Sequence, residues 1–388
     1  MLRNRWGILA VLFAVRATMA VQFQSVGAVA PLLSSELGFS IADIGILIGL
    51  YMAPGVALAL PGGAIGSRFG DKATVIGALL LMAGGSLTMA LAPAWPLQIA
   101  GRIAGGAGGV ILSVQLTKMV TDWFAGKEIA TAMAIFINSW PVGIAASLLL
   151  LPLLGTSLGV SAVHLGVAAY VAVCLLLLAV CYGPPVQTVQ PQAATQRLDR
   201  GVTLSLVAVG MVWGLFNVGF AMIFSFGPSM LVERGWSIGA AGSAISIVLW
   251  LSAISVPLGG VLADRFARPQ FVIVAAGIVT AALLFALPRS GSVLLTVVAL
   301  GVICGLPAGP TMSLPARLLQ PGTRAIGMGV FFTVYNICMM IGPAAAGALA
   351  KWSGSAGAAL DFGAALVLVC PLLLWFSNRI AAPAIKPA

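Results

Sequence analysis

The chain has 388 residues, of which 61% are hydrophobic and only 7% are charged, and its mean hydropathy is +1.11. No soluble domain of this length hides so much apolar surface in one core, so the composition excludes a soluble enzyme and indicates a protein of the lipid bilayer. The formal net charge of +10 does not indicate a nucleic-acid partner, because the cations follow the apolar stretches instead of gathering in one patch.

Apolar stretches of about 20 residues, the length that crosses roughly 30 Å of hydrocarbon, recur along the whole chain. Glycine (47 residues) and proline (22 residues) occur within many of them, which suits membrane helices that pack through small residues and tolerate bends. The pattern predicts an all-α membrane protein with twelve transmembrane helices, near residues 7–32, 41–61, 73–93, 97–120, 128–152, 160–182, 201–231, 238–259, 270–288, 293–316, 325–350 and 357–377.

The two halves of the chain repeat each other at a fixed offset of 197 residues. Residues 31–45 and 228–242 share Pro, Glu, Gly, Ser-Ile and Gly at matching positions, and residues 63–70 match residues 260–267 at the same offset. Two homologous halves in an apolar chain are typical of secondary transporters that arose by duplication.

A polar linker divides the chain near its midpoint, at residues 183–200. Its Pro, Gln and Thr residues are typical of a flexible tether. We therefore predict an N-terminal six-helix bundle at residues 1–182 and a pseudo-symmetric C-terminal six-helix bundle at residues 201–388. The sequence contains no G-x-x-x-x-G-K-[ST] loop, which argues against an ATP-driven pump.

Lysine and arginine residues between the spans are distributed unevenly over the two sides of the membrane. With a cytoplasmic N-terminus, only three lie outside: Arg234, Arg289 and Lys351. The other fourteen lie in the cytoplasm: Arg3, Arg5, Arg68, Lys72, Lys118, Lys127, Arg197, Arg200, Arg265, Arg268, Arg317, Arg324, Arg379 and Lys386. The positive-inside rule therefore predicts that both termini are cytoplasmic and that the protein crosses the bacterial inner membrane many times.

Two short segments carry a resemblance to a known family. Gly63-x-x-x-Ser67-Arg68-Phe-Gly70-Asp-Lys, with its copy around Asp264 and Arg265, resembles the signature loop G-x-x-x-D-R-x-G-x-[RK] of the major facilitator superfamily. Arg102-Ile-Ala-Gly-Gly-Ala-Gly-Gly resembles the pattern R-x-x-q-G-x-g-a of the same family. The resemblance covers essentially the whole chain and implies a twelve-helix transporter that works by alternating access, and not an enzyme.

The signature loop implies a set of gating residues. The resemblance assigns this role to Gly63, Arg68, Gly70, Asp264 and Arg265. Glycine lets two helix ends approach closely, and Arg with Asp bridges facing helix ends when the cytoplasmic side is closed. Ser67 stands where the family has Asp, which weakens the contact expected from the first copy.

Acidic residues are absent from the middle of every predicted span. All nine lie in loops or near helix ends: Glu36, Asp43, Asp71, Asp122, Glu128, Asp199, Glu233, Asp264 and Asp361. Proton-coupled carriers usually need a titratable group in the translocation path, and exporters of cationic drugs need an acidic one. The pattern argues against both classes.

Two arginines do lie within predicted spans, and a buried membrane charge is by default a candidate functional residue. Arg16 lies about 15 Å into the first span, near the bilayer midplane, with no acidic residue at its depth. We interpret it as a binding group for an anion. Arg102 lies nearer the outer end of the fourth span and has two equal interpretations: it binds substrate, or it bonds backbone carbonyls in a glycine-rich region.

The internal repeat indicates what faces Arg16, because position 213 is its counterpart in the seventh span. Helical spacing places Phe23 on the same face as Arg16, and Asn217 and Phe220 on the same face as Trp213. In the superfamily the first, fourth, seventh and tenth helices line the cavity. Weaker candidates, whose alternative role is packing, are Tyr51, Phe332, Tyr335 and Asn336.

We therefore predict a transporter of a small monovalent anion, organic or inorganic, that works as an exchanger or uniporter and as a monomer. It looks most like the cyanate and nitrate/nitrite branch of the superfamily. The alternatives are a proton-coupled organic-anion symporter of the same fold and a non-transporting membrane sensor. We expect no cofactor and no metal site, since the five cysteines lie inside spans as apolar core thiols.

Overall fold

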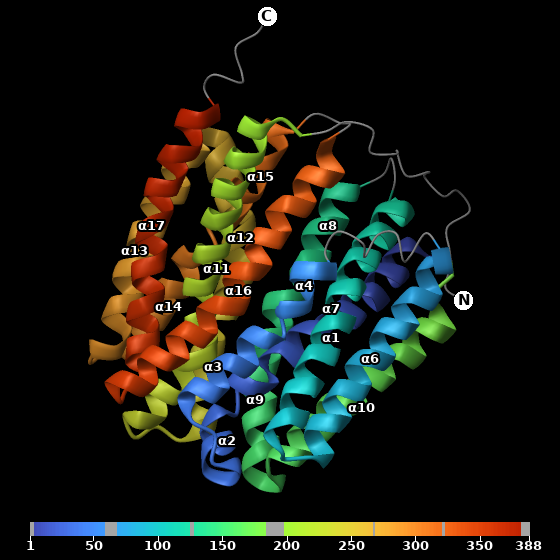
Figure 1. Ribbon diagram of the computed structural model, residues 1–388, viewed down its shortest axis with the longest axis vertical. Helices are drawn as coiled ribbons and strands as arrows, with labels where there is room; N and C mark the ends of the chain where they lie inside the picture. Colours follow the sequence, from blue (N-terminus) through green and yellow to red (C-terminus); the bar gives the residue numbers. More distant parts are fainter. Residues whose placement is uncertain are drawn as a thin grey trace, which may run out of the picture.

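The computed structural model describes residues 4–58, 68–124, 128–183, 198–266, 268–319 and 323–381. This part of the chain contains twelve segments long and apolar enough to cross a membrane, so the predicted all-α fold with twelve spans is confirmed. The helices, shown in Figure 1, are α1 (Arg5–Gly27), α2 (Ala30–Leu37), α3 (Ile41–Leu50), α4 (Ala53–Leu58), α6 (Asp71–Leu91), α7 (Trp95–Phe124), α8 (Ile129–Ile137), α9 (Ser139–Leu158), α10 (Val160–Cys181), α11 (Arg200–Glu233), α12 (Ile238–Phe266), α13 (Pro269–Ala286), α14 (Val293–Cys304), α15 (Ala308–Leu318), α16 (Arg324–Ser353) and α17 (Gly357–Ala381).

Three of the spans are broken into two helices each: α3 with α4, α8 with α9, and α14 with α15. A similar break separates the first span, α1, from the short helix α2 that follows it. A proline follows each break, within or just before the first turn of the second helix: Pro31, Pro54, Pro141 and Pro307. Proline lacks the backbone N–H that a helix interior needs, but the first turn of a helix does not use that N–H. Each of these prolines therefore stands where a new helix can begin without losing a hydrogen bond.

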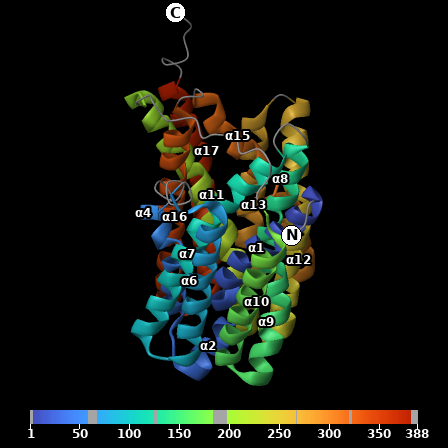
Figure 2. The same ribbon diagram turned by 90° about the vertical axis from the view of Figure 1, so that its right-hand side faces the viewer.

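The turns between helices define the two ends of the molecule. We call the end formed by turns 38–40, 92–94, 234–237, 290–292 and 354–356 the distal end, and the end that carries the last turn of α17 the proximal end (Figure 1). In Figure 2, turned by 90°, α2 again lies low and α15 and the C-terminal end lie high. The predicted linker at 183–200 joins α10 to α11, and residues 184–197 of it lie outside the described residues.

Two glutamates at the distal end occupy equivalent positions in the repeat. Glu36 accepts a hydrogen bond (3.0 Å) from the backbone N–H of Val160, the first residue of α10. Glu233, at the matching position, accepts from the backbone N–H of Ala356 (2.9 and 3.0 Å), directly before α17. A carboxylate at a helix N-terminus satisfies free N–H groups and interacts favourably with the helix dipole. The duplication therefore preserves a specific contact as well as a sequence pattern.

The turn that follows each glutamate is duplicated too. Gly38 and Gly235 adopt positive φ angles of 70° and 85°, a backbone region that glycine enters without steric cost. Two residues later, the Ser40 hydroxyl accepts from the backbone N–H of Asp43, and the Ser237 hydroxyl accepts from that of Ala240. These hydroxyls act as helix N-caps, so each half of the chain ends its first span and starts its second in the same way.

The two halves pack against each other through glycines in the distal part of the molecule. Helix α3 contacts α16, where a Cβ at Gly49 would overlap the carbonyl oxygen of Met340 and a Cβ at Gly45 would overlap that of Pro343. Helix α12 contacts α9, where a Cβ at Gly242 would overlap the carbonyl oxygen of Leu148. Small residues let membrane helices approach to backbone contact. The distal part of the molecule is therefore closed by two tight helix pairs.

Gly49→Ala is expected to destabilise this closed arrangement, because the new methyl group forces α3 away from α16. Overpacking of this kind costs about 1–3 kcal/mol. We expect the thermal unfolding midpoint of the purified protein in detergent to fall by at least about 2 °C.

The matched control is Gly77→Ala in α6, where a Cβ meets no atom within 4 Å. Alanine is favoured over glycine inside a helix by about 1 kcal/mol, so this midpoint should stay or rise. Equal decreases for both variants would show that α3 and α16 are not packed as described.

Candidate functional site

Arg16 lies in the middle of α1 and reaches the break between α8 and α9. Its Nη1 donates to the carbonyl oxygens of Phe136 (3.0 Å) and Ile137 (3.1 Å) and to the hydroxyl of Ser139 (3.3 Å). Its guanidinium carbon lies 4.7 Å from the centroid of the Phe136 ring. The guanidinium of Arg16, which we predicted to lie near the midplane of the membrane, is therefore hydrogen-bonded to the C-terminal end of α8.

The contacts of Arg16 compensate its charge only in part. Carbonyl oxygens at the end of a helix carry a partial negative charge, equivalent to about half an elementary charge for the whole terminus. Among the described residues no carboxylate pairs with Arg16, and its Nε is buried without a hydrogen-bond partner. A guanidinium in this setting keeps a net positive charge and free donor capacity, which suits an anion.

Aromatic residues from the second half of the chain face Arg16. The side chain of Arg16 lies near that of Tyr335 in α16. The ring of Tyr335 lies 6.3 Å from that of Trp213 in α11 and 6.4 Å from that of Phe332. We call Arg16, Phe136, Trp213, Phe332 and Tyr335 the Arg16 cluster. It contains Trp213, the residue that the internal repeat placed opposite Arg16, and it joins both halves of the chain.

Asn217 and Phe220 follow Trp213 along α11 at helical spacing. The side-chain amide nitrogen of Asn217 donates to the carbonyl oxygen of Trp213 (2.8 Å). The side-chain oxygen of Asn217 takes no part in this bond. Phe220 packs against Phe224, with ring centroids 5.3 Å apart. Asn217 therefore lies beside the Arg16 cluster, whereas Phe220 belongs to a separate group of rings nearer the distal end.

Phe23 and Tyr51 lie in this second group of rings and are buried. Their ring centroids are 5.7 Å apart, and both side chains are at most 2% exposed. The Tyr51 hydroxyl donates to the carbonyl oxygen of Met19 (3.3 Å) and contacts Oε1 of Gln22 (3.4 Å). Phe23 and Tyr51 therefore lie farther from the proximal end than Arg16 does. They fill space between spans.

Arg102 has the geometry expected of an arginine that bonds backbone carbonyls, the second of its two predicted interpretations. Its side chain is 1% exposed and donates to the carbonyl oxygens of Leu47 (2.8 Å), Gln22 (2.7 Å) and Phe23 (3.1 Å). Its guanidinium carbon lies 4.8 Å from the centroid of Tyr51. Arg102 thus connects α7 to α1 and α3, and this geometry favours backbone bonding over substrate contact.

Asn336 is buried at the contact between the two halves. Its amide donates to the carbonyl oxygen of Phe332 (2.7 Å) in its own helix. Its side chain lies directly against Gly55 of α4, where a Cβ would overlap it. Asn336 therefore packs α16 against α4, whereas its neighbour Tyr335 belongs to the Arg16 cluster.

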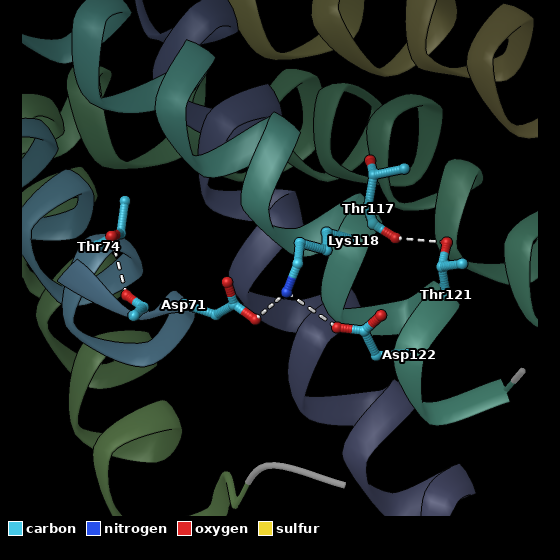
Figure 3. Close-up of polar contacts among 7 residues, drawn as sticks. Asp71, Thr74, Thr117, Lys118, Thr121 and Asp122 are labelled. Atoms are coloured by element: carbon cyan, nitrogen blue, oxygen red, sulfur yellow. Dashed lines mark hydrogen bonds and ion pairs between the residues drawn. The ribbon is translucent and has the colours of Figure 1, made fainter. Parts of the chain in front are cut away.

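The signature loop leads into an ion cluster at the proximal end, shown in Figure 3. Gly70, with a φ of 81°, precedes α6. Asp71 then binds Nζ of Lys118 in α7 at 2.5 Å, and Lys118 also binds Asp122 at 3.0 Å. Lys118 and Asp122 stand four residues apart on one helix face. That spacing is the sequence signal for this cluster, which our sequence analysis did not use.

Only part of the predicted gating set is described. Arg68 and Arg265 are exposed at the proximal end, and Lys72 donates to the carbonyl oxygens of Ala179 (2.7 Å) and Tyr182 (3.0 Å) at the end of α10. Gly63 and the side chain of Asp264 lie outside the described residues. The gating role of these residues stays a prediction.

The partners of Arg16 at the break between α8 and α9 are residues of the candidate site that the sequence analysis did not predict. Phe136, Ile137 and Ser139 surround the break at Asn138, where α8 ends and α9 begins. The proline at position 141 signals a helix interruption nearby. What the sequence does not contain is the fact that this interruption lies next to Arg16, 120 residues away along the chain.

Comparison with known families agrees with the fold. The chain matches the family model described as Major Facilitator Superfamily over residues 12–232 and again over residues 203–388. The two matches together cover nearly the whole chain and repeat across it, as expected from the internal duplication. The chain belongs to the Major Facilitator Superfamily, whose members are membrane transporters and not enzymes.

Individual relatives are transporters as well. An uncharacterized MFS-type transporter of Mycobacterium tuberculosis is 25% identical over 375 residues, which cover 89% of this chain and 79% of that protein. The uncharacterized MFS-type transporter YddS of Bacillus subtilis is 23% identical over 384 residues, or 91% of this chain and 86% of the relative. A putative tartrate transporter of Agrobacterium vitis is 27% identical over 197 residues, or 48% of this chain and 41% of the relative.

Proposed function

We propose that this transporter carries a small anion, organic or inorganic, and binds it at the Arg16 cluster. The observation that carries the proposal is the partly compensated charge of Arg16 between the two halves of the chain. One face of the guanidinium is engaged by the end of α8, and Tyr335 and Trp213 lie on the side of the second half. An anion between them would complete the charge balance of the bundle.

The composition of the cluster supports a substrate with one negative charge. A single guanidinium binds a carboxylate or a nitrate-like group through parallel N–H donors in one plane. The rings of Trp213 and Tyr335 suit the flat face of such a group, and the Asn217 amide adds a polar group beside it. The relative named a putative tartrate transporter adds support for an organic anion.

The positions of the carboxylates argue for transport without proton coupling. Asp71 and Asp122 are bound to Lys118 at the proximal end, and Glu36 and Glu233 are bound to helix N-termini at the distal end. Each of these groups therefore has a partner far from the Arg16 cluster. We propose exchange of one anion for another, because the loaded carrier has the better compensated charge.

The charge distribution supports an orientation with the proximal end in the cytoplasm. Arg5, Arg68 and Arg379 lie there, whereas Arg234 and Arg289 lie at the distal end. Positively charged residues next to spans favour the cytoplasmic side. In a bacterial inner membrane the distal end would then face the periplasm.

Single cysteines test this orientation. On a background with all native cysteines replaced, we expect an impermeant thiol reagent added to spheroplasts to modify Ser35→Cys and to leave Arg200→Cys unmodified. Both side chains are exposed, so access to the reagent differs only by the side of the membrane. Modification of Arg200→Cys alone would reverse the proposed orientation.

Arg16→Ala is expected to abolish anion binding and still fold, because it removes a buried charge without leaving another one unpaired. Arg16→Lys should weaken binding about tenfold, since lysine keeps the charge but loses the planar pair of donors. The measurement is thermal stabilisation of the purified protein by the sodium salts of nitrate, cyanate, formate, acetate and tartrate, followed by calorimetry with those that stabilise it.

The control for this series is Arg200→Ala, which removes an exposed arginine at the start of α11. It should bind the same anions as the unchanged protein. An Arg16→Ala protein that binds them with unchanged affinity would refute the proposed site.

Transport in proteoliposomes tests the exchange mechanism. We expect labelled anion to enter vesicles preloaded with the same unlabelled anion at least about tenfold faster than empty vesicles, because the empty carrier must close around an uncompensated charge. Net uptake would also work against an inside-negative potential, at roughly 2.3 kcal/mol per charge per 100 mV. Equal rates without an imposed gradient would contradict exchange, and stimulation by an imposed proton gradient would favour a proton-coupled symporter.

A further inference from the structure

Five aromatic side chains meet on the distal side of the Arg16 cluster. Phe23 of α1 packs against Phe224 of α11, with ring centroids 6.2 Å apart, and against Tyr51 and Trp140 at 5.7 and 5.5 Å. Phe224 in turn packs against Phe220 at 5.3 Å. Phe23 and Phe224 are 1% and 2% exposed. Because α1 and α11 belong to different halves, the pair of Phe23 and Phe224 closes the space between the halves.

A hydrogen bond joins the halves at the same place. The amide of Gln24 donates to the backbone carbonyl oxygen of Phe224 at 2.6 Å, and Gln24 is 1% exposed. One turn further along α1, a Cβ at Gly27 would lie 3.0 Å from Cα of Ser225, so the two helices approach to backbone contact. Residue Phe224 is thus held through both its ring and its carbonyl group.

These contacts lie between the Arg16 cluster and the distal end. Phe23 follows Arg16 by seven residues in one continuous helix, which is about 10 Å along the helix axis. On α11, Phe224 follows Trp213 toward the distal end in the same direction. The pair of Phe23 and Phe224 therefore lies between the Arg16 cluster and the distal end.

Arg102 holds the first-half side of this contact in place. Its two Nη atoms bind the carbonyl oxygens of Gln22 and Phe23, and its Nε binds that of Leu47 in α3. Its guanidinium also covers the ring of Tyr51, which touches Phe23. All of these bonds lie within the first half of the chain. They connect the residues around Phe23 to α3, the helix that packs against α16 at the distal end.

We propose that Phe23 and Phe224 form a distal gate and that Arg102 is its positioning residue, which keeps Phe23 and α3 moving as one unit. Opening of the gate breaks the bond from Gln24 to Phe224 and separates the two rings, because both contacts cross between the halves. The bonds of Arg102 persist, because none of them crosses. This gate is independent of the identity of the substrate and of the proposed orientation.

The gate is tested by cysteine labelling in reconstituted full-length protein, with Asn217→Cys as the reporter beside the Arg16 cluster. The distal face is defined as the face from which Ser35→Cys is labelled by an impermeant maleimide. With the gate intact, Asn217→Cys should react slowly from that face. Phe224→Ala should raise this rate about tenfold, because a lost ring pair and its buried area shift the closed and open populations by more than about 1.4 kcal/mol.

Two further variants separate the gate from a general loss of stability. Gln24→Ala removes the bond between the halves but keeps every ring, and it should also raise the labelling rate from the distal face. Phe271→Ala is the matched control, since Phe271 is 67% exposed on α13, and it should leave the rate unchanged. Unchanged rates in both Phe224→Ala and Gln24→Ala, with monodisperse protein, would overturn the gate.

Arg102→Lys tests the positioning role. Lysine keeps the charge but cannot bind three carbonyl oxygens on two helices, so labelling of Asn217→Cys from the distal face should rise at least about threefold. Arg5→Lys removes the same planar group in the same half, at the proximal start of α1 where Arg5 pairs with Glu128, and its labelling rate should stay that of the unchanged protein. An equal rise in both arginine variants would refute a specific role for Arg102. Loss of anion binding in Arg16→Lys, in contrast, reports only on the proposed substrate site.

Discussion

The proposed site of this transporter depends on one positive charge, the partly buried guanidinium of Arg16 in the middle of α1. A charge at this depth costs several kcal/mol unless other groups compensate it. The chain supplies carbonyl oxygens from the end of α8 and the face of Phe136, and it supplies no carboxylate among the described residues. The remaining positive charge is the basis of our proposal that an anion binds between the halves.

Arg102, which is buried, also places a positive charge among apolar helices, but its charge is compensated more fully than that of Arg16. Arg102 binds three carbonyl oxygens and covers the ring of Tyr51, so its charge is dispersed among fixed dipoles. These bonds connect α1, α3 and α7 into one unit in the first half. Two arginines in similar apolar helices thus differ in how their charges are compensated: two carbonyl oxygens accept from Arg16, and three accept from Arg102.

The duplication accounts for the helix caps that the two halves share. It does not make the residues of the proposed site alike in the two halves. Glu36 and Glu233, with the turns that follow them, repeat the same helix caps in both halves. The position equivalent to Arg16 carries Trp213, so the charge of the cluster comes from the first half, and three of its four rings come from the second half. The predicted substrate residues accordingly separate into two groups. Trp213, Tyr335, Phe332 and Asn217 lie with or beside Arg16, whereas Phe23, Phe220 and Tyr51 form the group that contains Phe224.

The sequence by itself determined the twelve spans, the repeat and the two arginines within spans, because hydrophobic length, internal similarity and charge are properties of local segments. Through the offset of the repeat, it also predicted that Trp213 lies opposite Arg16. Only the tertiary structure decided the partners of each arginine. The end of α8 meets Arg16 from 120 residues away, and Leu47 meets Arg102 from 55 residues away. Backbone carbonyls are identical in every residue, so no sequence pattern marks which of them a buried charge will bind.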